Sequence, residues 1–357
     1  MSQGEFSGTM PVNDRQRFDE ASLGRWLQAH LPAFAGLARV EQFRGGQSNP
    51  TFLLTAEDGA QYVLRKKPAG TLLPSAHAVD REFRVISALH GSGVPVARPL
   101  CLCTDASVIG TMFYLMAYAP GRNFWDATLP RMTPPERAAL YDEMNRVIVA
   151  LHTLDYVTAG LGDYGKPGNY FARQIGRWSG QYRASETERV EAMEKLLVWL
   201  PANIPAGDET ALVHGDYRLD NLIFDAGSPR MLAVVDWELS TLGHPLADFS
   251  YHVMLWRIPA GEAGGLQGLD LPRLGIPSEQ QYVAAYCART GREGVDPRVW
   301  EFCMAYNLFR IACIRQGIMK RVLEGTAASR HAREAGSKAR ATAELAWQQV
   351  EEHLGGA

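Results

Sequence analysis

The hydrophobic periodicity of the chain changes near Gly121, and this change restricts the possible folds more than any other feature. Before Gly121, short runs rich in β-branched and aromatic residues are separated by turn residues, a pattern typical of antiparallel strands. Beyond Gly121, apolar residues recur mostly at the three- and four-residue spacing of helices. Strands followed by helices predict an α+β fold, with a small antiparallel β lobe and a larger helical lobe.

The small lobe is expected to contain three strands, a helix and two further strands. These strands are expected at 40–43, 51–56, 61–67, 99–104 and 112–118, and the helix at 79–90. In the larger lobe, helices are expected at 134–154, 186–199, 278–290 and from 297 onward, with a β-rich island at 211–235. The stretch 261–277 contains five glycines and two prolines, which predicts a loop.

The length of the chain, 357 residues, also favours two lobes, because one hydrophobic core rarely grows beyond roughly 250–300 residues. We expect a helical lead at 1–34, including an amphipathic helix at 17–31, then an N-lobe at 35–120 that binds nucleotide. Residues 121–357 are expected to form the helical C-lobe with the catalytic loop and the acceptor site.

Composition excludes several classes of protein. A hydrophobic content of 46% and a charged content of 21% are ordinary for a globular protein. The net charge of −3 provides no general attraction for nucleic acid, and no apolar run approaches the length of a membrane span. The five cysteines are scattered without a CxxC pair, as expected for buried thiols of a cytoplasmic protein.

The β-rich island carries the densest set of chemical side chains. Its first strand, 211–213, leads into a polar loop with Asp216 and Asn221, and the hairpin of 222–224 and 231–235 returns the chain to Asp236. These three side chains can therefore converge at one end of a small sheet. Phosphoryl transfer needs such a set, namely a carboxylate for the attacking hydroxyl and hard oxygen ligands for Mg²⁺. The alternative is a polar turn whose aspartates only cap it.

The pattern His214-x-Asp216-x-x-x-x-Asn221, followed by Val-Val-Asp236-Trp, resembles the aminoglycoside phosphotransferase (APH) family, relatives of protein and choline kinases. The resemblance continues into Gly243-x-Pro245-x-x-Asp248 and covers residues 35–320. It is closest to the kinase-like domain that some animal proteins fuse to an acyl-CoA dehydrogenase. The family implies a protein kinase-like bilobal fold.

The resemblance also implies a role for each residue of the island. Asp216 is expected to be the catalytic base, and Asn221 and Asp236 are expected to bind Mg²⁺. His214 is expected to brace the loop, and Asp248 to anchor it through hydrogen bonds.

The N-lobe is expected to bind ATP, although GTP is not excluded. The glycine-rich turn with Gly45, Gly46 and Ser48 would approach the phosphates, unless it is a plain hairpin turn. At the end of the third strand, Arg65 and Lys67 would share one face and Lys66 the other, which leaves open which cation meets the phosphates. The remaining expected nucleotide-site residues are Glu82, which would hold that cation, and Met116 and Tyr118 in the segment between the lobes.

The sequence says least about the phosphate acceptor. Eight Arg and Lys residues stand against two Glu between 310 and 340, which favours an anionic acceptor over a polycationic aminoglycoside, unless this is only a solvated basic helix face. With the family resemblance, we expect a small-molecule hydroxyl acceptor such as a hydroxyacyl-CoA or a hydroxy acid. The alternatives are a nucleotide-binding regulatory protein with little catalysis, and an aminoglycoside or macrolide phosphotransferase. The oligomeric state and a lid role for 261–277 stay open.

Overall fold

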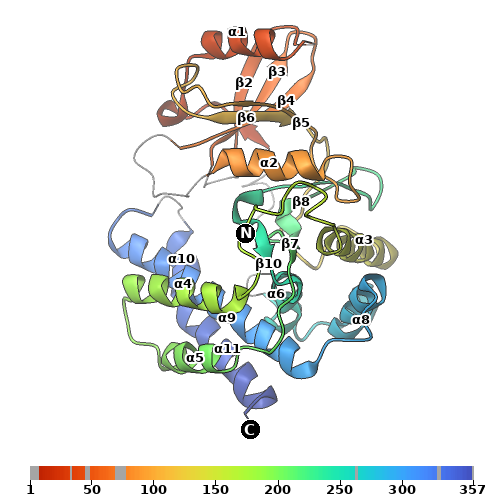
Figure 1. The fold of residues 1–357 in the computed structure, drawn as a ribbon, viewed down its shortest axis with the longest axis vertical. Coiled ribbons are helices and arrows are strands. Elements are labelled where there is room, and N and C mark those ends of the chain that lie inside the picture. The colour runs from red at the N-terminus through yellow and green to blue at the C-terminus, as the bar shows by residue number, and fades with distance from the viewer. Residues whose placement is uncertain are drawn as a thin grey trace.

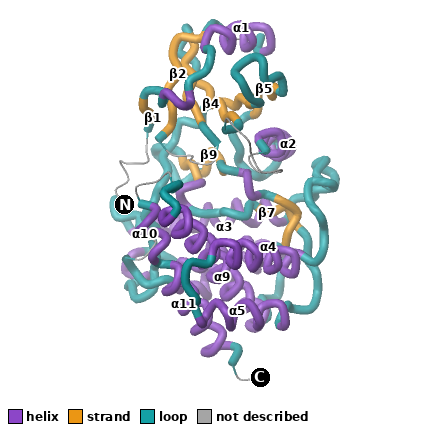
Figure 2. The backbone as a smooth tube through the Cα atoms, turned by 90° about the vertical axis from the view of Figure 1, so that its left-hand side faces the viewer, coloured by secondary structure: helices purple, strands orange, loops and turns teal. Residues whose placement is uncertain are grey.

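The computed structural model describes residues 8–32, 34–44, 49–68, 78–261, 264–327 and 331–355. A strand-rich lobe lies above a larger helical lobe, with the C-terminus at the far end of the helical lobe (Figure 1). The view at right angles shows most strands in the upper part and most helices in the lower part (Figure 2). The expected α+β architecture is therefore confirmed.

The upper lobe is built on one antiparallel six-stranded sheet with the order β1-β2-β3-β4-β6-β5. Its elements are β1 (Thr9–Met10), a 3-10 turn (Asp14–Gln16), α1 (Glu20–His30), β2 (Leu37–Phe43), β3 (Thr51–Ala56), β4 (Gln61–Lys66), α2 (Val79–Leu89), β5 (Pro99–Cys103) and β6 (Phe113–Ala117). The strands expected from the sequence are present within a few residues of their predicted ends.

Part of the range expected as a helical lead packs with the sheet. Strand β1 pairs with β2, and Leu23 and Leu27 of α1 lie in the same hydrophobic cluster as Phe52 and Leu54 of β3. The lead therefore contains a strand as well as the expected helix. The proposed domain boundaries at 34 and 120 stay a prediction.

The lower lobe surrounds two small sheets with helices. Its helices are α3 (Pro134–His152), α4 (Tyr170–Ser185), α5 (Glu191–Ala202), α6 (Pro245–Val253), α7 (Leu271–Leu274), α8 (Glu279–Thr290), α9 (Pro297–Leu323), α10 (Ala332–Ser337) and α11 (Ala339–His353). Its strands are β7 (Ala211–Val213), β8 (Leu222–Phe224), β9 (Met231–Val234) and β10 (Thr241–Gly243), with 3-10 turns at Leu219–Asn221, Trp237–Leu239 and Met254–Arg257. Strand β7 pairs with β10, and β8 forms a hairpin with β9.

Several expectations for this lobe need correction. Helix α5 begins at Glu191 rather than at Glu186, and the sequence did not predict α4 or α6. The stretch 261–277 is not wholly a loop, because its described part contains the one-turn helix α7. None of the described helices is long and apolar enough to cross a membrane. All five cysteines are free thiols, and four of them are buried.

Helix α2 connects the two lobes. Its buried residues Val79, Val85, Ile86 and Leu89 belong to the hydrophobic cluster of the lower lobe, although the helix follows β4 of the upper sheet. Val85 and Ile86 each lie three or four residues from Leu89, and Val79 lies two turns before Ile86, so the four define one apolar face, as expected for an amphipathic helix. Glu82 is buried on the same helix, so this packing holds a carboxylate between the lobes.

Candidate active site

Asp216 and Asn221 are brought together by the loop that follows β7. The Nδ2 of Asn221 donates to the carboxylate Oδ2 of Asp216 at 3.0 Å and to its backbone oxygen at 2.9 Å. The other carboxylate oxygen, Oδ1, accepts a hydrogen bond of 2.6 Å from the hydroxyl of Tyr251. The convergence of Asp216 and Asn221 that the sequence predicted is therefore present.

Asp248 of α6 holds the start of this loop. Its carboxylate accepts hydrogen bonds from the backbone N–H groups of His214 at 2.7 Å and Gly215 at 2.8 Å. The ring of His152 lies 3.2 Å from the same carboxylate. Burial by itself raises the pKa of Asp248, but these hydrogen bonds and the nearby histidines lower it overall, so the carboxylate stays charged.

His214 links the loop to the strand that leads to Asp236. Its ring is completely buried, with Nε2 3.0 Å from the backbone oxygen of Val235. Its Nδ1 accepts the backbone N–H of Asp216 at 3.2 Å. With Nδ1 as the acceptor, Nε2 is the ring nitrogen that donates to Val235. The ring fixes the spacing between the segments that carry Asp216 and Asp236.

Gly215 is required by the close packing of this loop. Its φ of 79° lies in the left-handed region, and a Cβ atom built there would lie 2.7 Å from the backbone oxygen of Leu239. Both the conformation and the contact exclude a larger side chain. The loop can therefore lie directly against the segment that follows Asp236.

Asp236 meets a cation from the upper lobe. The Nη2 of Arg65, at the end of β4, lies 2.5 Å from its Oδ1. Asp236 itself has a φ of 69°, which turns the chain sharply after β9. Glu238, two residues later, lies 3.9 Å from the same Arg65 nitrogen. Two carboxylates of the lower lobe thus face one guanidinium of the upper lobe.

Glu82 holds Arg65 in this position. Its Oε2 lies 2.9 Å from the Nε of Arg65, and it also accepts hydrogen bonds from Asn49 at 2.6 Å and Tyr114 at 3.2 Å. Burial raises the pKa of Glu82, against the lowering effect of Arg65. Burial alone would lower the pKa of Arg65, but the charges of Asp236 and Glu82 raise it overall, so the cation is retained.

The other two cations of the basic trio differ in position. Lys66 is buried on the opposite face of β4, with its Nζ 5.9 Å from the ring centre of Phe18 and 5.8 Å from that of Phe52. Burial lowers the pKa of Lys66. Lys67 follows the strand and donates its backbone N–H to Met112. Of the three, Arg65 has the contacts expected of the cation paired with Glu82.

The remaining residues of the expected nucleotide site are Met116 and Tyr118, in the segment between the lobes, and the three residues of the glycine-rich turn. Met116 lies in β6 opposite Val63, and Tyr118 donates its backbone N–H to the oxygen of Gln61 at 3.3 Å. That N–H is therefore occupied, whereas Ala119 forms no backbone hydrogen bond through its N–H within the described ranges. The expected phosphate contacts Gly45, Gly46 and Ser48 lie outside the described residues.

The donors at this site fit a magnesium ion that is completed by a nucleotide. Within the described ranges, no cluster of three or more acidic, histidine or cysteine side chains could hold a metal alone. The Nδ2 of Asn221 is directed to Asp216, which leaves its amide oxygen for a cation, and Asp236 supplies a carboxylate. Mg²⁺ commonly binds one or two such oxygens together with substrate phosphates.

Two residues that contact the loop were not identified from the sequence in this role. Tyr251 on α6 is hydrogen-bonded to Asp216, and its only sequence signal is that it lies three residues after Asp248. Arg310 of α9 donates from Nη2 to the backbone oxygen of Gly215 at 2.6 Å. Arg310 was counted among the basic residues for the acceptor, but its side chain is buried and braces the loop instead.

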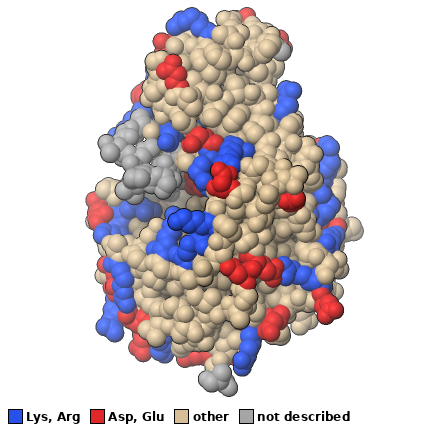
Figure 3. Space-filling view, viewed as in Figure 1, with Lys and Arg blue, Asp and Glu red and all other residues tan. Residues whose placement is uncertain are grey.

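Other members of the basic stretch 310–340 are also engaged within the lobe. Lys320 donates to the backbone oxygen of Ala184, Lys338 pairs with Glu334, and Arg340 lies 2.7 Å from Glu188. On the face shown in Figure 3, Lys and Arg side chains gather above and below the hollow between the lobes, with Asp and Glu beside the upper group. Side chains of both charges thus border the hollow on this face.

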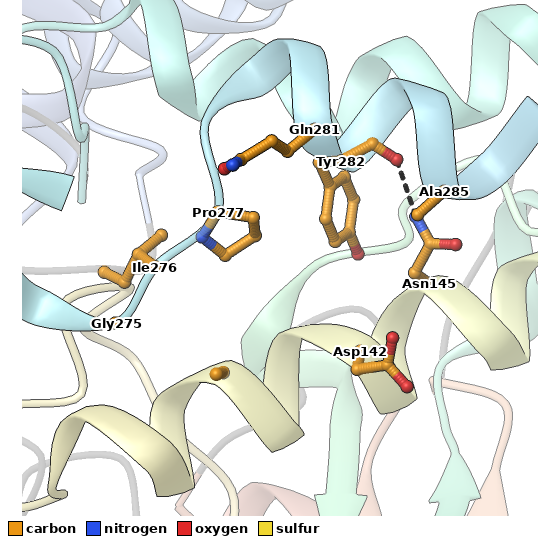
Figure 4. Close-up of a pocket in the computed structure, with 9 residues that line it drawn as sticks. Asp142, Asn145, Gly275, Ile276, Pro277, Gln281, Tyr282 and Ala285 are labelled. Carbon is orange, nitrogen blue, oxygen red and sulfur yellow. Dashed lines mark hydrogen bonds between the residues drawn. The ribbon is translucent and has the colours of Figure 1, made fainter. Parts of the chain in front are cut away.

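A separate cavity of about 280 Å³ lies between α3 and α8. Figure 4 shows Asp142 and Asn145 on one side and Tyr282 on the other, with Asn145 donating to the backbone oxygen of Tyr282 at 2.9 Å. The lining residues are Ala138, Asp142, Asn145, Gly275, Ile276, Pro277, Gln281, Tyr282 and Ala285. Neither Asp216, Asn221 nor Asp236 lines it, so this cavity is not the site described above.

Comparison with known proteins gives consistent matches. The sequence profile of the APH group, described as the phosphotransferase enzyme family, matches residues 39–299. The chain is 45% identical to acyl-CoA dehydrogenase family member 10 of Mus musculus over 342 residues, which are 95% of this chain and 32% of that protein. It is 43% identical to family member 11 of the same species, over 90% of this chain and 42% of that protein. The chain thus spans less than half the length of these curated relatives.

Solved structures show the same fold. A candidate aminoglycoside phosphotransferase from Ralstonia eutropha is 54% identical, with a TM-score of 0.85 over 94% of this chain and 99% of that one. Spectinomycin phosphotransferase, solved in complex with ADP and spectinomycin, superimposes with a TM-score of 0.62 over 94% of this chain and 100% of that one, at 14% identity. The second likeness concerns the fold alone. Together they confirm the expected kinase-like bilobal fold.

Proposed function

The chain belongs to the phosphotransferase enzyme family, and from this premise we propose that it is an ATP- and Mg²⁺-dependent small-molecule kinase. It would transfer the γ-phosphoryl group of ATP to a hydroxyl group of the acceptor. The observation that carries this proposal is that Asn221 contacts Asp216 through its side chain and accepts the backbone N–H of Val235, the residue before Asp236. Arg65 then joins Asp236 to the upper lobe. A base, two oxygen donors and a phosphate-binding cation are the groups that phosphoryl transfer requires.

Each residue has a distinct proposed role in the reaction. Asp216 orients the acceptor hydroxyl and accepts its proton as the oxygen attacks phosphorus. Asn221 and Asp236 would hold Mg²⁺, which neutralises charge on the phosphates. Arg65, positioned by Glu82, contacts the α- and β-phosphates.

The adenine would lie against the segment that joins the lobes. Met116 would flank the base, and Tyr118 would contribute its side chain or carbonyl, because its N–H is bonded to Gln61. The N–H of Ala119 is the group that we assign to the adenine edge. We favour ATP over GTP, and direct competition between the two nucleotides checks this choice.

For the acceptor we propose a hydroxyacyl-CoA or a related hydroxy acid. Support comes from the relatives at 43–45% identity, which are named as acyl-CoA dehydrogenase family members and contain a segment similar to this chain. It also comes from the Lys and Arg side chains that gather at the hollow between the lobes (Figure 3). We expect the reaction to occur in the cytoplasm, where the five free thiols would stay reduced.

A screen of hydroxyl compounds with ATP and Mg²⁺, read by mass spectrometry, tests this function. The panel contains hydroxyacyl-CoA esters, free hydroxy acids, an aminoglycoside and a macrolide, and Asp216→Asn is the matched control for background ATP hydrolysis. Phosphorylation of an acyl-CoA or hydroxy acid by the wild-type enzyme alone supports the proposal. Selective phosphorylation of an antibiotic replaces the proposed acceptor, and nucleotide binding without any product favours a regulatory role.

A further inference from the structure

Tyr251 contacts the proposed base from the side opposite Asn221. Its hydroxyl donates to Oδ1 of Asp216 at 2.6 Å, while Nδ2 of Asn221 donates to Oδ2 at 3.0 Å. The two carboxylate oxygens therefore each receive one hydrogen bond. Because the terminal torsion of an aspartate is broad by itself, donors on both oxygens restrict the plane of its carboxylate.

The same helix fixes the backbone and the side chain of the loop. Asp248, one helical turn before Tyr251 on α6, accepts the N–H groups of His214 and Gly215. Tyr251 then holds the side chain of the next residue, Asp216. Residues three apart on a helix share one face, so α6 presents both contacts to the loop together.

The position of Tyr251 is itself restricted. Its side chain is 4% exposed, and the guanidinium of Arg310 lies 4.7 Å from the centre of its ring. Arg310 also donates to the oxygen of Gly215, so it contacts both α6 and the loop. Burial, followed by the charge of Asp216, raises the pKa of the phenol, which therefore remains a hydrogen-bond donor near neutral pH.

We propose that Tyr251 is a positioning residue for phosphoryl transfer, which holds the Asp216 carboxylate in the orientation that receives the acceptor proton. This inference rests on the proposed function, in which Asp216 is the base. Removing the hydroxyl leaves Oδ1 without its protein donor and allows the carboxylate to rotate. Small misplacements of a reacting group cost catalytic rate rather than nucleotide affinity.

The test compares Tyr251→Phe with Tyr141→Phe in the full chain. Tyr141 is a matched control, since it is also buried and its hydroxyl donates to a backbone oxygen, that of Ala127, at 2.7 Å. With the acceptor found in the screen, we expect Tyr251→Phe to lower kcat about tenfold, with the KM for ATP within about twofold of wild type. Tyr141→Phe should retain kcat. Equal kcat losses in the two variants, or no loss in Tyr251→Phe, overturn the proposal.

A crystal structure of Tyr251→Phe provides a readout that does not depend on an acceptor. We expect the Asp216 carboxylate to leave the plane that it occupies in the wild-type protein, while the backbone of 214–216, held by Asp248, stays in place. An unchanged carboxylate overturns the positioning role. If the wild-type enzyme phosphorylates nothing in the screen but the carboxylate rotates in the variant, the proposed acceptor chemistry fails while the contact assigned to Tyr251 stands.

Discussion

Arg65 Nη2 lies 2.5 Å from Asp236 Oδ1, so a cation of the upper sheet directly contacts a proposed metal ligand of the lower lobe. The same guanidinium is held by Glu82 through its Nε. A Mg²⁺ ion bound by Asp236 would compete with Arg65 for the carboxylate. Nucleotide phosphates would give Arg65 a new anionic partner at the same time.

Arg65→Lys tests this relationship. Lysine retains the charge but lacks the planar fork that reaches Glu82 and Asp236 simultaneously. We expect the KM for ATP to rise about tenfold, equivalent to about 1.4 kcal/mol of binding free energy. Steady-state kinetics with varied ATP at constant free Mg²⁺ measure it. Lys67→Ala serves as the comparison, and a larger effect there than in Arg65→Lys would assign the phosphate contact to Lys67.

Asp216→Asn separates chemistry from binding. The amide has nearly the size of the carboxylate but cannot accept the acceptor proton, so we expect kcat to fall about 10³-fold. Binding of Mg-ATP, measured by calorimetry, should change little. Asp220→Asn is the control in the same loop, because the carboxylate of Asp220 is bonded to Arg218 instead. Retention of wild-type turnover by Asp216→Asn would contradict the assignment of the base.

The elements that the sequence did not predict have identifiable physical reasons. All residues of α6 are buried, so the helix has no solvent-exposed polar face and lacks the amphipathic pattern by which a surface helix is recognised. Helix α4 includes Gly176 and Gly180, which have low helix propensity, and it is stabilised by packing against α9. By contrast, the strands of the upper lobe are short runs rich in apolar and β-branched residues, and glycine and aspartate mark the turn between β3 and β4.

Local sequence patterns predicted one part of the site but not the contacts that hold it from distant helices. Asp216 and Asn221 are five residues apart in one polar loop, so their contact could be predicted locally. The predicted return of the chain by a hairpin is present, and Val235, the residue before Asp236, donates its backbone N–H to the oxygen of Asn221. Alternation along β4 placed Arg65 and Lys66 on opposite faces correctly. Tyr251 and Arg310 contact the loop across 35 and 95 residues of sequence, respectively. Such contacts depend on how α6 and α9 pack, which no local pattern encodes.

Gly215→Ala should disrupt the loop directly. The substitution places a Cβ atom 2.7 Å from the oxygen of Leu239 at a residue with a φ of 79°. We expect a loss of about 2 kcal/mol or more in the free energy of unfolding, together with loss of activity. Gly176→Ala is the control, since its Cβ meets no heavy atom within 4 Å. In helix α4 it should raise stability by about 0.5–1 kcal/mol. Comparable urea midpoints for both variants would refute the strain argument.

His252 predicts how stability depends on pH. It is buried in α6, with Nε2 2.8 Å from the hydroxyl of Tyr282, and burial lowers its pKa from 6.5 to about 4. Between these values the unfolded chain binds a proton that the folded protein does not. The free energy of unfolding therefore falls as the pH falls from 6.5 to about 4. At about 1.4 kcal/mol for each pKa unit, the full effect is about 3 kcal/mol.

His252→Gln should remove this pH dependence, because glutamine can still donate to Tyr282 but does not titrate. Urea unfolding at several pH values between 4.5 and 7 measures the slope of the unfolding free energy, so a uniform loss of stability in the variant does not affect the comparison. Exposed His30 provides the control through His30→Gln, which should keep the wild-type slope. Other groups, such as His244, whose pKa burial also lowers, contribute equally to all three proteins. Identical slopes in wild type and His252→Gln would show that His252 takes up its proton equally in the folded and unfolded states.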